Sequence, residues 1–311
     1  MTISQPLVSL IVPSYNGGKD VLECLHSIFD LDFKDFEVIL VDNGSTDDSA
    51  RVAGKSFPEI KVIHLDRNVG YGKAVNFGIA NSKGLYVGFL DNDVAVSLSW
   101  LSELLRVIEV DDTIGIVGGL VYAYSTGNIV YNGGGLVDMR NGHVRVLGVG
   151  LRDFGQFRGS RQVDWVSGAS ILVRRQLLER VGFFDEGYVF YRDEVDLCVK
   201  ARCLGYRVMF THRAVSWHKG SSTMTRMGLK FYYLYRSWIR FVIIHVKRRY
   251  LLQAVLSVVL ITLAKSVEAI LKGNRFALQQ AFGAIWWNIV FLPSILRSRM
   301  NRYLLGAARL Q

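Results

Sequence analysis

Short apolar runs alternate with helical patterns along the first 95 residues of the chain. The runs at 7–13, 36–42, 60–65 and 86–90 have the length and composition of buried β-strands. Between them, apolar residues at a spacing of three or four predict helices at about 19–29, 48–55 and 74–80. Because strands and helices that alternate in this way form right-handed βαβ units, we expect an α/β fold with a mainly parallel central sheet.

The pattern is less regular in the next part of the chain. It predicts a helix at about 99–110, a strand at 114–121, hairpins and loops in the glycine- and aromatic-rich stretch 122–162, a helix at 175–181, a helix that starts among residues 191–198 and ends at Gly205, a strand at 206–211 and a polar loop at 215–223. We expect the stretch 122–162 to shape part of a pocket.

Acidic residues stand where two of the predicted strands end. Asp91-Asn92-Asp93 follows the strand at 86–90, and Asp42 closes the strand at 36–42. The carboxyl ends of parallel strands meet at the edge of the sheet where open α/β folds bind ligands. Paired carboxylates also suit a hard divalent cation that bridges phosphates, although Asp and Asn are equally common in ordinary turns.

The glycine-containing loop Gly70-Tyr71-Gly72 is only a weak signal for phosphate binding. It lacks the third glycine of the dinucleotide fingerprint and does not follow the first strand. A simple NAD-binding domain is therefore disfavoured.

Further candidates for chemistry lie downstream. Asp193, Glu194 and Asp196 fall at a predicted helix start, where acids commonly cap the helix and favour its dipole. A general base must also be a carboxylate near the reacting hydroxyl, so one of these acids can serve both purposes. His218 is either a structural histidine or a ligand, and the pattern alone leaves both readings open.

The last 65 residues differ from the rest in charge. Residues 247–311 hold ten of the 37 Lys and Arg but one of the 27 acids, Glu268, so nearly all of the net charge of +10 lies there. The same part contains uncharged apolar runs at 251–264 and 276–296, with Trp286 and Trp287 in the second. The first run is shorter than the roughly 20 residues of a spanning helix.

A basic, aromatic-rich tail of this kind, at 224–311, is typical of a helical segment at a membrane surface. A buried helix pair and an oligomer interface are the alternatives, and the concentration of charge outside the folded domain disfavours nucleic-acid binding. Three unpaired cysteines (Cys24, Cys198 and Cys203) and a short polar N-terminus favour the cytoplasmic face of the cell membrane, with peripheral or monotopic attachment.

An ordered series of motifs resembles the family-2 glycosyltransferases, which are inverting nucleotide-sugar enzymes with the Rossmann-like GT-A fold. The motifs cover about residues 7–240 and are Val12-Pro13-Ser14-Tyr15-Asn16, Val41-Asp42-Asn43-Gly44-Ser45-Thr46-Asp47, Asn68-Val69-Gly70, Asp91-Asn92-Asp93, Ser167-Gly168-Ala169, Gly182-Phe183-Phe184-Asp185-Glu186, Asp193-Glu194-Val195-Asp196-Leu197 and His218. Each is weak alone, but their order is specific. The chain is most similar to the rhamnosyltransferase-like branch, which builds bacterial surface polysaccharides.

The resemblance implies roles for individual residues in a catalytic domain at 1–223, with a nucleotide-binding half at about 1–95 and an acceptor half at about 96–223. It implies that Pro13, Tyr15, Asp42, Asn68, Lys73 and Asp91 bind the donor, that Trp165, Gly168, Asp185 and Asp196 lie on the acceptor side, and that Asp93, Asp91 and His218 hold Mg²⁺ or Mn²⁺. The family usually has Glu-Asp where this chain has Asp193-Glu194. The base corresponds to the second residue of that pair, hence Glu194, and the swap leaves Asp193 as an alternative.

The resemblance thus implies transfer of a single hexosyl or rhamnosyl group from a UDP-, dTDP- or GDP-sugar to a lipid-linked or polysaccharide hydroxyl. The alternative of an oligomer interface in the tail leaves a homo-oligomer open. A nucleotidyltransferase would carry a glycine-rich basic loop after the first strand, where this chain has Pro13-Ser14-Tyr15-Asn16. A processive polysaccharide synthase would usually show Gln-x-x-Arg-Trp after the base, and the sequence has none. A non-catalytic GT-A scaffold subunit would be expected to have lost the acids.

Overall fold

The computed structural model describes residues 5–220 and 228–307. Its strands are β1 Val8–Ser14, β2 Phe36–Asp42, β3 Lys61–His64, β4 Tyr86–Leu90, β5 Val94–Val96, β6 Ile114–Ala123, β7 Val130–Asn132, β8 Gly135–Asp138, β9 His143–Val146, β10 Ser160–Val163, β11 Ser170–Arg174 and β12 Arg207–His218. Its α-helices are α1 Gly18–Phe29, α2 Ser49–Ser56, α3 Tyr71–Ala80, α4 Trp100–Ile108, α5 Arg175–Val181, α6 Asp193–Cys203, α8 Lys230–His245, α9 Leu251–Leu271, α10 Ala277–Val290 and α11 Leu292–Ala307.

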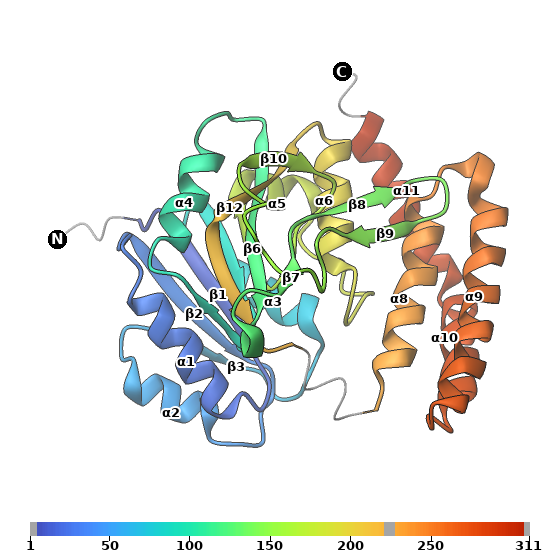
Figure 1. The fold of residues 1–311 in the computed structure, drawn as a ribbon, viewed down its shortest axis with the longest axis horizontal. Helices are drawn as coiled ribbons and strands as arrows, with labels where there is room; N and C mark the ends of the chain where they lie inside the picture. Colours follow the sequence, from blue (N-terminus) through green and yellow to red (C-terminus); the bar gives the residue numbers. More distant parts are fainter. Residues whose placement is uncertain (1–4, 221–227, 308–311) are drawn as a thin grey trace.

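The central sheet has the order β10-β12-β6-β11-β4-β1-β2-β3 (Figure 1). Strands β3, β2, β1 and β4 are parallel, as the alternating pattern predicts. β11 lies between β4 and β6 and is antiparallel to both, so the second half of the sheet is mixed. The carboxyl ends of β1 and β4 point to the same edge, which carries the acidic residues.

Helices cover both faces of the sheet. Because alternate residues of a strand point to opposite sides, each strand contributes residues to a core on either face. In β1, Leu10 and Val12 pack in a core with helices α1, α2 and α4, whereas Ile11 packs in a second core with α3, α5 and α6. All seven residues of β1 are buried. This explains why the central strands read as continuous apolar runs rather than as alternating ones.

One prediction is wrong near the end of the catalytic part. The stretch predicted as a polar loop at 215–223 is instead β12 as far as His218. Its residues pair with β6 in parallel and with the short strand β5 in antiparallel, after a register shift between Phe210 and Val215. Strands β5 and β6 are remote in sequence, and they supply the backbone hydrogen bonds of a segment that has no strand pattern of its own. The rest of the predicted loop, 221–223, lies outside the described residues.

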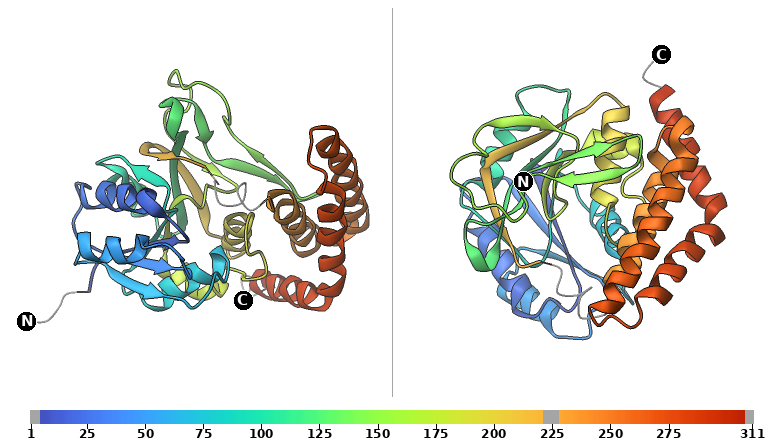
Figure 2. Two further views of the ribbon diagram at one scale, coloured as in Figure 1. Left: turned by 90° about the horizontal axis from the view of Figure 1, so that it is seen from below. Right: turned by 45° about the vertical axis from the view of Figure 1, so that its right-hand side comes forward.

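Helix α8 belongs to the main core although it follows the boundary that the sequence suggested at 223/224. Every residue from Tyr235 to His245 is buried, and Trp238 and Phe241 join the core that contains α6. The same core also takes in Ala254 and Val258 of α9, Ala284 of α10 and Ile295 of α11, so the domain boundary stays a prediction. Helices α9, α10 and α11 form a further layer outside α8 (Figure 2).

Helix α9 is the most apolar of the outer layer. Among the described residues, Arg248–Leu271 is the one helix long and apolar enough to cross a membrane. Only 22% of its most apolar stretch is buried within the protein, so it differs from an ordinary core helix. Leu252, Leu256 and Leu260 repeat every fourth residue on one exposed face, and Phe282 and Trp286 of α10 are likewise exposed.

Candidate active site

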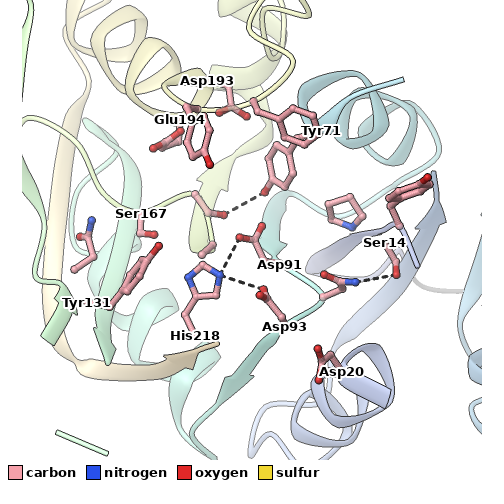
Figure 3. Close-up of a pocket in the computed structure, with 18 of the residues that line it drawn as sticks. Ser14, Asp20, Tyr71, Asp91, Asp93, Tyr131, Ser167, Asp193, Glu194 and His218 are labelled. Atoms are coloured by element: carbon pink, nitrogen blue, oxygen red, sulfur yellow. Dashed lines mark hydrogen bonds and ion pairs between the residues drawn. The ribbon is translucent and has the colours of Figure 1, made fainter. Parts of the chain in front are cut away.

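A cleft of about 470 Å³ opens at the carboxyl edge of the sheet. Its wall combines the ends of β1, β4 and β12 with the start of α6 and part of the stretch 122–162 (Figure 3). The lining residues are Pro13, Ser14, Tyr15, Asn16, Gly17, Asp20, Asn43, Asn68, Tyr71, Asp91, Asn92, Asp93, Tyr131, Asn132, Val146, Val149, Trp165, Ser167, Gly168, Ala169, Phe190, Tyr191, Asp193, Glu194 and His218. The expectation that 122–162 shapes a pocket is confirmed.

Asp91, Asp93 and His218 come together on one wall of this cleft. The Nε2 atom of His218 lies 3.1 Å from a carboxylate oxygen of Asp93 and 3.6 Å from one of Asp91. The local fold explains the meeting, because His218 is paired in the sheet with Val94, the residue that follows Asp93. One ligand atom from each residue lies within 4.8 Å of the others.

The electrostatics of the cluster follow from its burial. Burial raises the pKa of Asp91 to about 6, with His218 opposing the rise and Asp93 adding to it. Burial alone would lower the pKa of His218, but the hydrogen bond to Asp93 and the charge of Asp91 raise it above its ordinary value. Two carboxylates in a partly desolvated wall thus attract a positive charge.

The residues present fit a divalent cation. Two carboxylate oxygens and one imidazole nitrogen converge, and the other ring nitrogen of His218, Nδ1, is buried without a hydrogen-bond partner among residues 5–220 and 228–307. Carboxylate ligands suit Mg²⁺ and Mn²⁺, and an added imidazole is compatible with Mn²⁺.

Asp193 and Glu194 lie on the opposite wall, at the first turn of α6 (Figure 3). Asp193 is buried, and its Oδ2 atom has no hydrogen-bond partner among the described residues. Burial and the neighbouring Glu194 hold the pKa of Asp193 well above its usual range. Gly168 leaves room for Glu194, because a Cβ at position 168 would lie 3.0 Å from the Cβ of Glu194.

The segment that leads into α6 has an unusual backbone. Val189, Tyr191 and Arg192 have φ of 60°, 64° and 68°, a left-handed region that non-glycine residues rarely adopt. Such residues cost on the order of 1 kcal/mol each and cluster at functional sites. The strained segment delivers Phe190 and Tyr191 to the cleft wall and then begins the helix that bears the two acids.

The remaining wall is formed by the loops after β1, β2 and β3. Asn43, after β2, donates a hydrogen bond to Asn68, after β3, at 3.2 Å. Asn92, after β4, donates one to Ser14 at the end of β1, at 3.0 Å. A Cβ at position 17 would lie 2.5 Å from the Ser14 hydroxyl, so a larger residue there would displace this side chain. Of the residues predicted to bind the donor, Pro13, Tyr15, Asn68 and Asp91 line the cleft.

Asp42 and Lys73, also predicted donor residues, are not among the lining residues. Asp42 accepts one hydrogen bond from the Ser45 backbone amide (3.0 Å) and lies 3.0 Å from Nδ1 of His64. Lys73 is half exposed and lies 3.5 Å from Glu186. The structure therefore brings neither side chain to the cleft, and their donor role stays a prediction.

The predicted acceptor residues divide in the same way. Trp165 and Gly168 line the cleft, but Asp185 and Asp196 lie outside it. Asp185 is paired with Arg240 of α8 at 2.7 Å. Asp196 is almost fully buried between Lys200 at 2.7 Å and His245 of α8 at 2.6 Å. These contacts support a structural role for both acids.

Replacing Asp196 by asparagine should lower the free energy of unfolding at pH 7 by about 3–5 kcal/mol, because Lys200 would be left buried without its partner. Burial alone would raise the pKa of Asp196, but Lys200 and His245 hold it below its usual range. A depressed pKa in the folded state gives stability that is present above the unfolded pKa of about 3.9 and is lost as the pH falls through the folded value.

The free energies of unfolding of the original protein and of Asp196→Asn, measured with urea, should therefore become more similar below about pH 4. Asp48→Asn, at an exposed ion pair with Arg51, is the matched control and should change stability little. An Asp196→Asn protein as stable as the original would contradict the structural role.

Several cleft residues were not predicted as site residues. Tyr131 packs edge-on against His218 with ring centroids 4.8 Å apart, and the Tyr71 hydroxyl donates to the Gly168 carbonyl at 3.3 Å. Burial and the charge of Asp91 raise the pKa of Tyr71 well above its ordinary value, so it stays a neutral donor. No local pattern marks these tyrosines, since each comes to the cleft from a segment far from the acids.

Comparison with known proteins identifies the class. The model of the family described as glycosyl transferase family 2 matches residues 9–182, more than half of the chain. The chain therefore belongs to glycosyltransferase family 2.

Two relatives illustrate the match. The chain is 29% identical over 246 residues to an N-acetylglucosaminyl-diphospho-decaprenol L-rhamnosyltransferase of Mycobacterium tuberculosis, covering 72% of this chain and 78% of that protein. It is 32% identical over 129 residues to glycosyltransferase GlyG of Streptococcus pneumoniae, covering 40% of this chain and 43% of GlyG. In two further relatives, the matched part makes up 25% and 37% of the relative's own length, so these alignments do not extend to whole proteins.

Solved structures confirm the GT-A fold. A mannosyltransferase of Pyrobaculum calidifontis, in complex with GDP-Man and Mn²⁺, has a TM-score of 0.57 at 18% identity and is matched over 99% of this chain and 88% of that one. TarS 1–349 of S. aureus, in complex with UDP-GlcNAc, has a TM-score of 0.60 at 18% identity, over 96% and 89%. At this identity the likeness concerns the fold alone.

Proposed function

We propose that this chain transfers a single sugar from a nucleotide-sugar to an acceptor hydroxyl, with inversion at the anomeric carbon and with a divalent cation. One observation carries the proposal: the Asp91–Asp93–His218 cluster and the Asp193–Glu194 pair face each other across one cleft (Figure 3). A cation-binding wall opposite a basic carboxylate is what displacement of a diphosphate by a hydroxyl requires.

Asp91, Asp93 and His218 would hold Mg²⁺ or Mn²⁺, and the ion would neutralise the charge that develops on the leaving diphosphate. The loops that carry Pro13, Tyr15 and Asn68 would hold the nucleoside next to this wall. The fold match to proteins solved with GDP-Man or UDP-GlcNAc supports a nucleotide-sugar donor, which would be of the UDP, dTDP or GDP type.

Glu194 would act as the general base. It would take the proton from the acceptor hydroxyl while that oxygen attacks the anomeric carbon from the face opposite the diphosphate, which inverts the configuration. The raised pKa of Asp193 supports this division, because a carboxyl group that keeps its proton cannot accept another. Protonated Asp193 would instead donate a hydrogen bond, and Trp165 and Gly168 would line the acceptor side.

We also propose that the acceptor is lipid-linked or part of a glycan and that the enzyme works at the cytoplasmic membrane face. The name of the mycobacterial relative describes a lipid diphosphate acceptor, which supports a similar acceptor class here. The exposed apolar residues of α9 and α10 support a peripheral or monotopic attachment, because soluble proteins rarely leave such a face uncovered.

The double substitution Leu256→Glu with Trp286→Glu should weaken binding to anionic liposomes by at least roughly a hundredfold, since each buried large apolar side chain contributes about 1.5–3 kcal/mol. Both residues are exposed, at 54% and 66%, so the fold should tolerate the change. Co-sedimentation with vesicles measures the effect.

Leu98→Glu is the matched control, because Leu98 is 62% exposed but lies in the segment before α4, outside the C-terminal helices. The control should bind vesicles as the original protein does. Unchanged vesicle binding by the double variant, together with loss of a dimer in solution, would instead make the face an interface between copies of the chain.

A further inference from the structure

The loop at residues 187–192 joins the cleft to the C-terminal helices. It supplies Phe190 and Tyr191 to the cleft wall and continues directly into Asp193 and Glu194. Its left-handed backbone at Val189, Tyr191 and Arg192 is unfavourable by itself, so contacts from outside the loop must hold it in place.

Helix α8 makes most of those contacts. The Ser237 hydroxyl lies 2.7 Å from the carbonyl oxygen of Phe190 and 3.2 Å from that of Tyr188, and it donates its proton to them. Arg236 donates to the Gly187 carbonyl at 2.7 Å. On the opposite side, the backbone amide of Tyr71 donates to the Val189 carbonyl at 2.9 Å. The loop is therefore held between the N-terminus of α3 and helix α8.

Arg240 adds a second support at the base of the same loop. Its guanidinium binds both carboxylate oxygens of Asp185 at 2.8 and 2.7 Å. It also packs on the backbone of Gly187, where a Cβ would lie 2.4 Å from the guanidinium carbon. The buried pair thus fixes the entry of the loop as Arg236 and Ser237 fix its middle.

The supporting residues of α8 are in turn held by the outer helices. Asn288 of α10 donates to the Arg236 carbonyl at 3.1 Å, and the Arg236 guanidinium lies 3.7 Å from the centre of the Trp287 ring. Arg240 donates to Ser298 of α11 at 3.2 Å. Trp286, next to Trp287, is on the exposed apolar face. Figure 1 shows α8 between the catalytic part and helices α9 and α10.

We propose that Arg236 and Ser237 are positioning residues for the transfer reaction. They hold the loop at 187–192 in the conformation that presents Tyr191 and Glu194 to the acceptor, and α10 holds Arg236. The expected effect on the transfer rate rests on the proposed function, whereas the expected effect on the conformation of the loop does not. Such positioning makes α8 part of the catalytic machinery and assigns the outer helices a role beyond attachment.

Ser237→Ala in the full chain tests the proposal. Without the hydroxyl, the loop should relax, so kcat for transfer should fall about tenfold while the donor KM stays within about twofold, because misplacement of a base affects the chemical step. Amide hydrogen exchange in peptides covering 187–196 should become faster in the same variant. This second readout requires no substrate.

Ser266→Ala is the matched control, because the Ser266 hydroxyl is equally buried and, within the part of the chain that the structure describes, bonds only to the Leu263 carbonyl of its own helix. It should alter neither kcat nor exchange at 187–196, and both variants should have similar melting temperatures. Unchanged exchange at 187–196 in Ser237→Ala, or a loss of kcat no larger than in the control, would overturn the proposal. An original protein that turns over no nucleotide-sugar would refute the proposed function instead, and the exchange measurement would still decide the inference.

Discussion

Replacing Asp93 by asparagine is expected to lower the transfer rate by about 10²–10³-fold, the loss seen when one electrostatic partner of a developing charge is removed. Asp93 makes the shorter of the two contacts with His218, at 3.1 Å, and lies in the wall that would hold the cation. An amide is neutral and a poorer ligand for a hard cation, so the Mn²⁺ concentration needed for half-maximal rate should also rise. Initial rates measured over a series of Mn²⁺ concentrations give both quantities.

The matched control for this substitution is Asp112→Asn. The Asp112 side chain is fully exposed, contacts Arg174 at 3.4 Å and lies outside the cleft. It should leave both the rate and the metal dependence unchanged. A rate for Asp93→Asn equal to that of the control would remove Asp93 from the metal site.

Replacing Glu194 by glutamine should abolish most of the transfer, by about 10²–10⁴-fold, because an amide cannot take the proton of the acceptor hydroxyl. Donor binding should persist, because the proposed cation ligands and the loops that carry Pro13, Tyr15 and Asn68 lie on elements other than α6. Titration calorimetry with the nucleotide-sugar and Mn²⁺, beside single-turnover transfer, separates the two effects.

Asp193→Asn makes the comparison decisive. If Asp193 keeps its proton and only donates a hydrogen bond, asparagine replaces it well and the rate should fall much less than in Glu194→Gln. The reverse order of the two losses would assign the base to Asp193.

The parallel half of the fold could be predicted from sequence because its signals are local. The bounds of β2 and β4 were predicted to the residue, since each strand is a continuous apolar run that ends at a polar turn. The ordered motifs also identified the family. Asp91, Asp93 and His218 were predicted as a metal site, and the structure brings them together although it does not test the role.

The errors and omissions arise from contacts between distant segments. β12 continues to His218 because β5 and β6 supply backbone partners from about 100 residues earlier. Asp185 and Asp196 face α8, so their buried partners Arg240 and His245 lie some 50 residues downstream. Tyr131 reaches His218 from the irregular stretch 122–162. No periodicity in a single window predicts such pairings.

The measurement that tests the central claim most directly is release of nucleoside diphosphate by the full chain from a panel of UDP-, dTDP- and GDP-sugars, with and without Mn²⁺. The proposed function predicts that one donor class is turned over, slowly with water and faster with a suitable glycan acceptor, and that chelation of the metal stops the reaction. Absence of binding and turnover for every donor, or equal turnover after complete removal of divalent cations, would contradict it.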